Sequence, residues 1–267
     1  MGMFFNPHSQ SPDRLRVLHR DVLKKFKLTR IEFRSFLILL LACIISNVLL
    51  LPYISSLLNT SHISSTTQLF SVILNGLIIY PIPIYVGLLL KKIVPVAGLT
   101  ILEGLKRFDF NDFLKFGLLT GLIAGVLILL LELFFIKMLP DLKSITPPGR
   151  FYGFLASFYG GIVEEVLMRL FLLSLLLVFL RRFNALGIWV AILSVAVIFG
   201  LGHLPTTVKA YALSSASELP ALMIVRALLL NGIVGVACGW LYWKKGLEYA
   251  ISSHFMTDLV IHVLWPI

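Results

Sequence analysis

Two adjacent carboxylates and an arginine, Glu164, Glu165 and Arg169, stand in the middle of a long apolar segment of the chain. The residues that follow are almost all apolar as far as Leu180. An ionisable side chain at bilayer depth costs roughly 2.5 to 3.5 kcal/mol even on mild insertion scales. Three such groups so close together therefore predict a hydrated site lined by protein.

The spacing predicts different roles for the two carboxylates. Residues four apart share a face of a helix, so we expect Glu165 to pair with Arg169 and to support the site structurally. Glu164 points about 100° away around the helix and lacks that partner. It is the candidate general base. Gly160 and Gly161, one turn earlier, allow another backbone or a substrate to come close.

Two further polar groups follow in later apolar segments. His203 ends the sequence Phe199-Gly200-Leu201-Gly202-His203, and His254 and Asp258 lie one helical turn apart, with His262 two turns beyond His254. A carboxylate one turn from an imidazole can orient the ring and raise its basicity. Two alternatives stay open: His203 as an interfacial residue, and His254 with Asp258 as a hydrogen-bonded pair that joins helices.

Polar residues in the third and sixth apolar segments receive structural interpretations. Arg226, which shares a segment with Asn231, is interpreted as a counter-charge for the carboxylates of the cluster. Glu132, near the end of the third apolar segment, is expected to reach the membrane interface together with Lys137.

The composition predicts an all-α, polytopic transmembrane helical bundle. Of the 267 residues, 58% are hydrophobic and 13% are charged, whereas a soluble domain carries about 25% charged residues. Continuous apolar runs of this length exclude a β-barrel, which needs short alternating segments. We expect about seven spans, within a range of six to eight, at residues 35–58, 66–90, 114–137, 151–180, 185–203, 221–243 and 247–265.

The net charge of +10 is concentrated in particular segments. Residues 1–34 form a basic segment that we place on cytoplasmic anionic headgroups, and we expect no nucleic-acid partner. Lysine and arginine recur in alternate linkers, which predicts a cytoplasmic N-terminus. The bilayer is the expected surrounding, in a bacterial plasma membrane, with the endoplasmic reticulum as the open alternative.

The chain is expected to divide at the proline-rich linker 140–149. Residues 35–140 would form a three-span part with an amphipathic interfacial stretch near 99–116, and residues 150–267 a four-span part that holds the catalytic core. Pro81 and Pro83 should kink the second span.

The polar motifs together resemble the CPBP family of intramembrane proteases, which includes the type II CAAX prenyl endopeptidases. That family carries E-E-x-x-x-R, F-x-x-x-H and H-x-x-x-N/D motifs on successive helices. Here they read Glu164 to Arg169, Phe199 to His203, and His254 to Asp258. The resemblance covers roughly residues 150–260.

The resemblance implies hydrolysis of a peptide bond in a hydrophobic or membrane-tethered substrate, prenylated or not. Glu164 and His203 would activate a water, and His254 with Asp258 would stabilise the oxyanion. Asn is commoner than Asp at the last position, so we assign Asp258 to orienting or charging His254. A proton-coupled transporter and a non-catalytic immunity or scaffold protein remain alternatives. The sequence indicates neither the natural substrate nor the oligomeric state.

The candidate residues are compatible with two mechanisms, one with a bound metal ion and one without. Relatives have been described as metalloproteases, and zinc could take nitrogen and oxygen ligands from Glu164, His203, His254 and Asp258. The same four residues suffice for a glutamate-based reaction without a cofactor, which we favour.

The levels of these residues along their helices conflict. Counted from the cytoplasmic ends, Glu164 and His203 lie about 25 to 28 Å up their helices and His254 about 13 Å. Three explanations are open: non-helical backbone at Gly246–Ala250, tilted or broken helices, or an error in one crossing of the topology.

Overall fold

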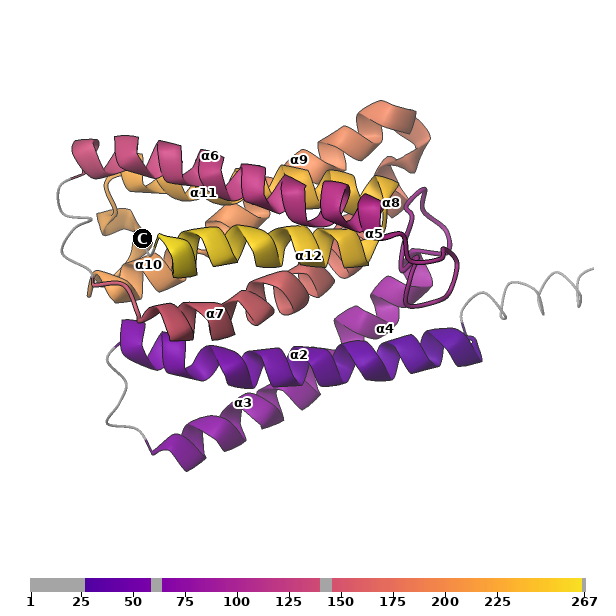
Figure 1. Cartoon of the computed structure of the whole chain (residues 1–267), viewed down its shortest axis with the longest axis horizontal. Helices are drawn as coiled ribbons and strands as arrows, with labels where there is room; N and C mark the ends of the chain where they lie inside the picture. Colours follow the sequence, from indigo (N-terminus) through magenta and orange to yellow (C-terminus); the bar gives the residue numbers. More distant parts are fainter. Residues whose placement is uncertain (1–26, 59–63, 140–145, 266–267) are drawn as a thin grey trace, which may run out of the picture.

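The computed structural model describes residues 27–58, 64–139 and 146–265, and within these ranges it contains helices and turns but no strand. The predicted all-α polytopic bundle is confirmed (Figure 1). The basic N-terminal segment lies largely outside the described residues, as does most of the linker 140–149.

Within the described ranges the chain forms seven long helical segments, several with π-helical (η) stretches. In chain order they are α2 (Arg30–Leu57); α3 (Ser65–Ile79) with α4 (Pro81–Leu90); α5 (Phe110–Asp112), η1 (Phe113–Leu118) and α6 (Leu119–Met138); α7 (Arg150–Phe158), η3 (Tyr159–Glu164), η4 (Val166–Leu173) and α8 (Ser174–Leu180); α9 (Asn184–Gly202) with α10 (Leu204–Ala210); α11 (Ala221–Lys244); and α12 (Leu247–Asp258) with η7 (Leu259–Leu264).

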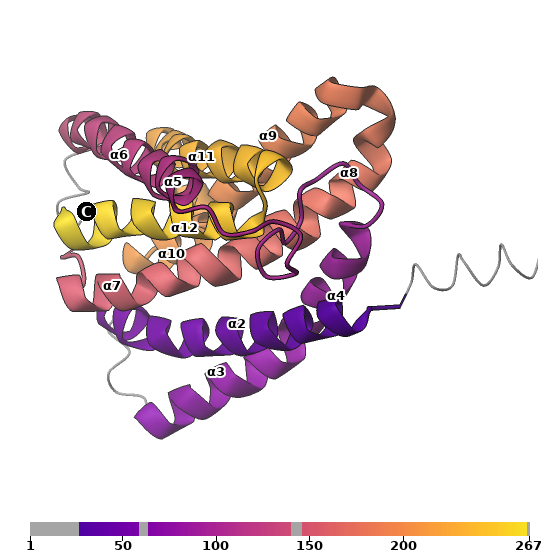
Figure 2. The ribbon, with the colours of Figure 1, turned by 45° about the vertical axis from the view of Figure 1, so that its right-hand side comes forward.

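Among the described residues, five of these segments are long and apolar enough to cross a bilayer. They correspond to the first, second, third, fifth and sixth predicted spans. The other two, α7 to α8 and α12 with η7, carry the first and third ionisable motifs, while the second lies at the end of α9. Both of these segments lie inside the bundle: α7 runs beside α2, and α12 lies between α7 and α6 (Figures 1 and 2).

The predicted proline kink in the second span is confirmed. The helix breaks at Tyr80, and α4 restarts at Pro81. Proline has no N–H, and its ring clashes with the preceding turn, so a continuous helix cannot pass through this point. α3 is therefore peripheral and packs mainly against α2 (Figure 2).

The start of α12 accounts for the difference in height that the sequence predicted between His254 and the pair Glu164 and His203. The helix begins directly at Leu247, so of the three open explanations the one with non-helical backbone at Gly246–Ala250 does not hold beyond Gly246. The chain turns at Gly246, whose φ of +119° favours glycine, and Leu247 is already 99% buried. α12 thus starts within the bundle, beneath the linker 91–109, and His254 reaches the level of the other motifs.

The linker 91–109 is held on α12 by one carboxylate. Residues 91–109 form turns, and the stretch 99–116 becomes helical only from Phe110. Glu248 accepts hydrogen bonds from the backbone N–H groups of Thr100, Ile101 and Leu102 at 3.2, 3.0 and 2.8 Å. This position for Glu248 was not apparent from the sequence.

Glu132 does not extend to the interface. It is 96% buried and forms a bidentate ion pair with Arg226 that joins α6 to α11. Arg226 Nε lies 2.7 Å from Oε2 of Glu132, and Arg226 Nη2 lies 2.8 Å from Oε1. The interpretation of Glu132 as a snorkelling residue is therefore wrong, and Arg226 neutralises Glu132 rather than the motif carboxylates. α6 also packs along α12, while the division into two parts stays a prediction.

Replacing Glu248 with alanine should release the linker 91–109. Three partly buried N–H groups lose their carboxylate acceptor, so we expect a loss of about 2 kcal/mol in unfolding free energy. Trypsin should then cut faster after Lys106 or Arg107 in the detergent-purified protein. Glu218→Ala is the matched control, because Glu218 accepts only an exposed contact from the Ser214 N–H within its own loop. Equal cutting rates in both variants would contradict the anchoring role.

Candidate active site

The first motif lies where the helix geometry changes. π-helical turns span Tyr159–Glu164 and Val166–Leu173 on either side of Glu165. π-helical turns inside α-helices are rare and frequent at functional sites. Here they hold two adjacent carboxylates that point to different neighbours.

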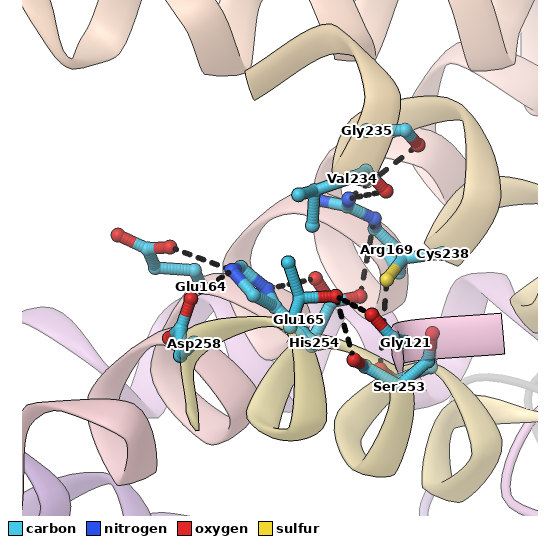
Figure 3. Close-up of polar contacts among 12 residues, drawn as sticks. Gly121, Glu164, Glu165, Arg169, Val234, Gly235, Cys238, Ser253, His254 and Asp258 are labelled. Carbon is cyan, nitrogen blue, oxygen red and sulfur yellow. Dashed lines mark hydrogen bonds and ion pairs between the residues drawn. The ribbon is translucent and has the colours of Figure 1, made fainter. Parts of the chain in front are cut away.

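Glu165 connects a buried cation to a buried imidazole. Its Oε2 lies 3.1 Å from Arg169 Nε, and its Oε1 lies 2.7 Å from His254 Nδ1 (Figure 3). Glu165 and Arg169 are fully buried, and His254 is 97% buried. The ion pair expected from the spacing is present, but the contact with His254 was not expected, because it joins residues 89 positions apart.

Arg169 also ties this chain of charges to α11. Its Nη2 donates to the carbonyl oxygens of Val234 and Gly235 at 3.3 and 3.4 Å (Figure 3). Its guanidinium lies 5.2 Å from the Phe199 ring centre. Phe199 also stands edge-on to the rings of His203 and His254. One phenylalanine thus packs against three members of the site.

Glu164 faces two imidazoles and remains partly open. Its Oε1 lies 3.8 Å from His203 Nε2, and its Oε2 lies 3.6 Å from His254 Nε2. These separations are longer than direct hydrogen bonds and suit groups that share a water. The Glu164 side chain is 21% exposed and that of His203 is 36% exposed. The structure therefore brings the three motifs together around a partly open carboxylate.

The orientation of His203 follows from its own helix. Its Nδ1 lies 2.8 Å from the carbonyl oxygen of Phe199, which can only accept a hydrogen bond. Nδ1 therefore carries the proton, and in the neutral ring Nε2 is the acceptor that faces Glu164.

Asp258 and Glu165 contact opposite nitrogens of His254. Asp258 Oδ1 lies 3.6 Å from His254 Nε2, the same nitrogen that faces Glu164. Nδ1 of His254 is hydrogen-bonded to Glu165. Of the two roles expected for Asp258, orienting or charging His254, this geometry is compatible with charging, while Glu165 makes the direct hydrogen bond to the ring.

Glycines allow the close approach of the two motif helices. A methyl group added to Gly160 would collide with the Asp258 carboxylate and lie 3.3 Å from His254 Nε2. Gly161 packs against the backbone of Ile251, and Gly153 against the backbone of His262. We call Gly153, Gly160 and Gly161 the glycine seam. It brings α7 and η3 into contact with α12 and η7.

The sequence-predicted zinc ligands do not gather around one point. Among the described residues, the one group of three ligand-type side chains with donor atoms within 4.8 Å is Glu165, Cys238 and His254. All three are buried, and the Arg169 guanidinium already neutralises Glu165. A catalytic zinc needs an open position for water, and a nearby cation opposes a dication. These residues do not fit a catalytic metal.

Two polar residues named from the sequence lie outside this arrangement. Asn231 donates to the carbonyl oxygen of Ala227 in its own helix, 2.8 Å away. His262 contacts Tyr53 of α2, a residue that the sequence did not single out.

Comparison with known proteins supports the motif assignment. Residues 146–260 match the family described as "Type II CAAX prenyl endopeptidase Rce1-like". The predicted resemblance is confirmed for these residues. No curated protein and no solved structure matches the chain.

Glu165→Gln should destabilise the fold, because it leaves Arg169 buried without a counter-charge. We expect a loss of about 3 kcal/mol or more, measured by thermal unfolding in detergent. Glu164→Gln is the adjacent control and should unfold near the wild-type temperature, since Glu164 balances no buried guanidinium. A Glu165→Gln protein as stable as the control would contradict the role of the ion pair.

Proposed function

We propose that this chain, whose residues 146–260 belong to the Rce1-like family, is an intramembrane endopeptidase that uses Glu164 as its general base. The observation that carries the proposal is the position of Glu164. Its carboxylate is partly open and lies at water-bridging distance from Nε2 of both His203 and His254. General-base hydrolysis needs a carboxylate within hydrogen-bond reach of a water that is aimed at the substrate.

Each proton in the proposed reaction has a defined position. A water held between Glu164 and His203 gives a proton to Glu164 while its oxygen bonds to the substrate carbonyl carbon. The carbonyl oxygen becomes an oxyanion. When the intermediate collapses, the C–N bond breaks and Glu164 returns the proton to the leaving nitrogen. The glutamate is thus base and then acid, and no step uses a metal.

His254 is the proposed oxyanion donor. Its Nδ1 donates to Glu165 at 2.7 Å, and its Nε2 faces Glu164 and Asp258. The carboxylates of Glu165 and Glu164, one on each side of the ring, stabilise the imidazolium, in which both nitrogens donate. Nε2 can then donate to the developing negative charge, as preorganised donors do in other hydrolases.

Asp258 is the proposed second group at the oxyanion. It borders Nε2 of His254 and packs against Gly160, so a bound carbonyl would lie near both side chains. An ionised carboxylate would repel an oxyanion, whereas a protonated one can donate a hydrogen bond, as an amide does. We therefore assign Asp258 the part that Asn plays in relatives.

The proposed substrate is a hydrophobic or membrane-tethered peptide, prenylated or not. The reacting residues come from three helical segments of a bundle, η3, the end of α9 and α12, and the bundle's candidate membrane spans are apolar. A substrate anchored in the bilayer would be concentrated at such a site. The location in a bacterial plasma membrane with a cytoplasmic N-terminus remains part of the proposal.

Glu164→Gln should abolish cleavage of membrane-tethered peptides, with a fall in kcat of at least about a hundredfold. The amide keeps the shape of the side chain but cannot accept the proton. Product formation by the purified protein in liposomes, followed by mass spectrometry, measures this. Retained cleavage would remove Glu164 as the base. Substrate-dependent flux without peptide products would indicate a carrier instead.

Asp258→Asn should keep most of the activity, since the amide supplies an N–H donor of the same size. Asp258→Leu should lose roughly a hundredfold or more, as removal of one oxyanion donor does elsewhere. The comparison uses kcat on one peptide for the three proteins. If the Asn and Leu variants were equally inactive, the ionised carboxylate itself would be required, and the donor role would be wrong.

A further inference from the structure

A tyrosine and a histidine outside the family-matched region lie next to the site. Tyr53 belongs to α2 and His262 to η7, so neither falls within residues 146–260. The Tyr53 hydroxyl lies 3.4 Å from His262 Nδ1, and the two rings stand edge to face with centroids 5.4 Å apart. Neither residue takes part in the proposed reaction.

His262 continues the polar row of the catalytic helix. His254, Asp258 and His262 follow one another at intervals of four residues, which keeps them on about the same face. His262 lies one turn beyond Asp258, whose carboxylate borders Nε2 of His254. The Tyr53–His262 pair thus borders the same polar region as Glu164.

The pair leaves a donor free. Among the described residues, the one hydrogen bond of the His262 ring is that between Nδ1 and the Tyr53 hydroxyl. If the hydroxyl donates to Nδ1, the proton of the ring lies on Nε2. In the other tautomer Nδ1–H donates to the hydroxyl, and the Tyr53 O–H remains available to a ligand. Both residues are of intermediate exposure. In either arrangement the pair therefore offers one hydrogen-bond donor to a ligand.

Backbone packing places His262 between α7 and α2. Gly153 of α7 packs against the backbone of His262, so α7 closes that side of η7. α2 packs along α7 (Figure 1), and its Tyr53 contacts Nδ1 of His262. η7 is itself π-helical, a geometry frequent at functional sites.

We propose that Tyr53 and His262 form a substrate subsite that binds an acceptor oxygen of the peptide, beyond the bond that is cleaved. The proposal rests on the endopeptidase function above. Eight residues of helix separate His254 from His262, roughly 12 Å. An extended peptide covers this in three to four residues at roughly 3.3 Å each. The bound oxygen belongs either to a terminal carboxylate or to a main-chain carbonyl at that distance.

The test uses full-length protein in liposomes and membrane-tethered peptides with one to six residues after the cleaved bond. Each length is made with a free carboxylate and with an amide at its end. KM and kcat are measured for wild type, Tyr53→Phe, His262→Leu and His262→Gln. Tyr242→Phe is the matched control, because Tyr242 forms a buried helix-joining hydrogen bond with Ser174, 2.8 Å long, in which neither residue belongs to the site.

The subsite predicts a length-dependent effect on KM. For peptides with three or more residues after the cleaved bond, Tyr53→Phe and His262→Leu should raise KM roughly three- to tenfold, with kcat nearly unchanged. Shorter peptides should show no change, and His262→Gln, which keeps an N–H donor, should recover part of the loss. If the rise in KM disappears for peptides that end in an amide, the bound oxygen belongs to the terminal carboxylate. If the rise persists, the bound oxygen belongs to a main-chain carbonyl.

Several results would overturn the proposal. An unchanged KM at every length excludes the subsite, as does a KM rise that is equal at all lengths or that Tyr242→Phe reproduces, since these indicate a structural effect. Wild-type protein that cleaves no peptide overturns the proposed function, and this inference with it. Cleavage by wild type without any length-dependent effect overturns the subsite alone.

Discussion

The need to neutralise a fully buried guanidinium governs this structure. Arg169 lies inside the bundle, where an unpaired charge costs several kcal/mol. One oxygen of the Glu165 carboxylate forms an ion pair with Arg169, and the other is hydrogen-bonded to His254. The interaction that stabilises Arg169 therefore also fixes the imidazole at the reactive side. Stability and site geometry depend on the same carboxylate.

The two neighbouring glutamates show how helix geometry separates roles. Glu165 is turned into the protein and has no exposed surface, whereas Glu164 is partly open and faces two imidazoles at longer distances. A carboxylate that is already bound by a cation and a ring cannot readily accept a proton. One without such partners can. Adjacent positions on a helix thus supply a structural residue and a reactive one.

The sequence predicted what local spacing determines and missed what depends on packing. The helical segments, the kink at Pro81 and the contact of Glu165 with Arg169 all follow from short-range patterns. Three contacts join residues far apart in the chain. They are the hydrogen bond between Glu165 and His254, the ion pair between Glu132 and Arg226, and the hydrogen bonds that Glu248 accepts from the linker 91–109. The level of His254 was misjudged because helix rise counts assume a start at the interface, whereas α12 starts beneath a linker.

The glycine seam has a mechanical consequence. Where Gly160 and Gly161 bring α7 and η3 into contact with α12, no free volume remains for the two helices to shift against each other. They behave as one stiff block that carries Glu164, His254 and Asp258. A movement that opens the site for a peptide must then come from the surrounding helices, such as α2 and α9. The distances among Glu164, His254 and Asp258 stay constant during such a movement.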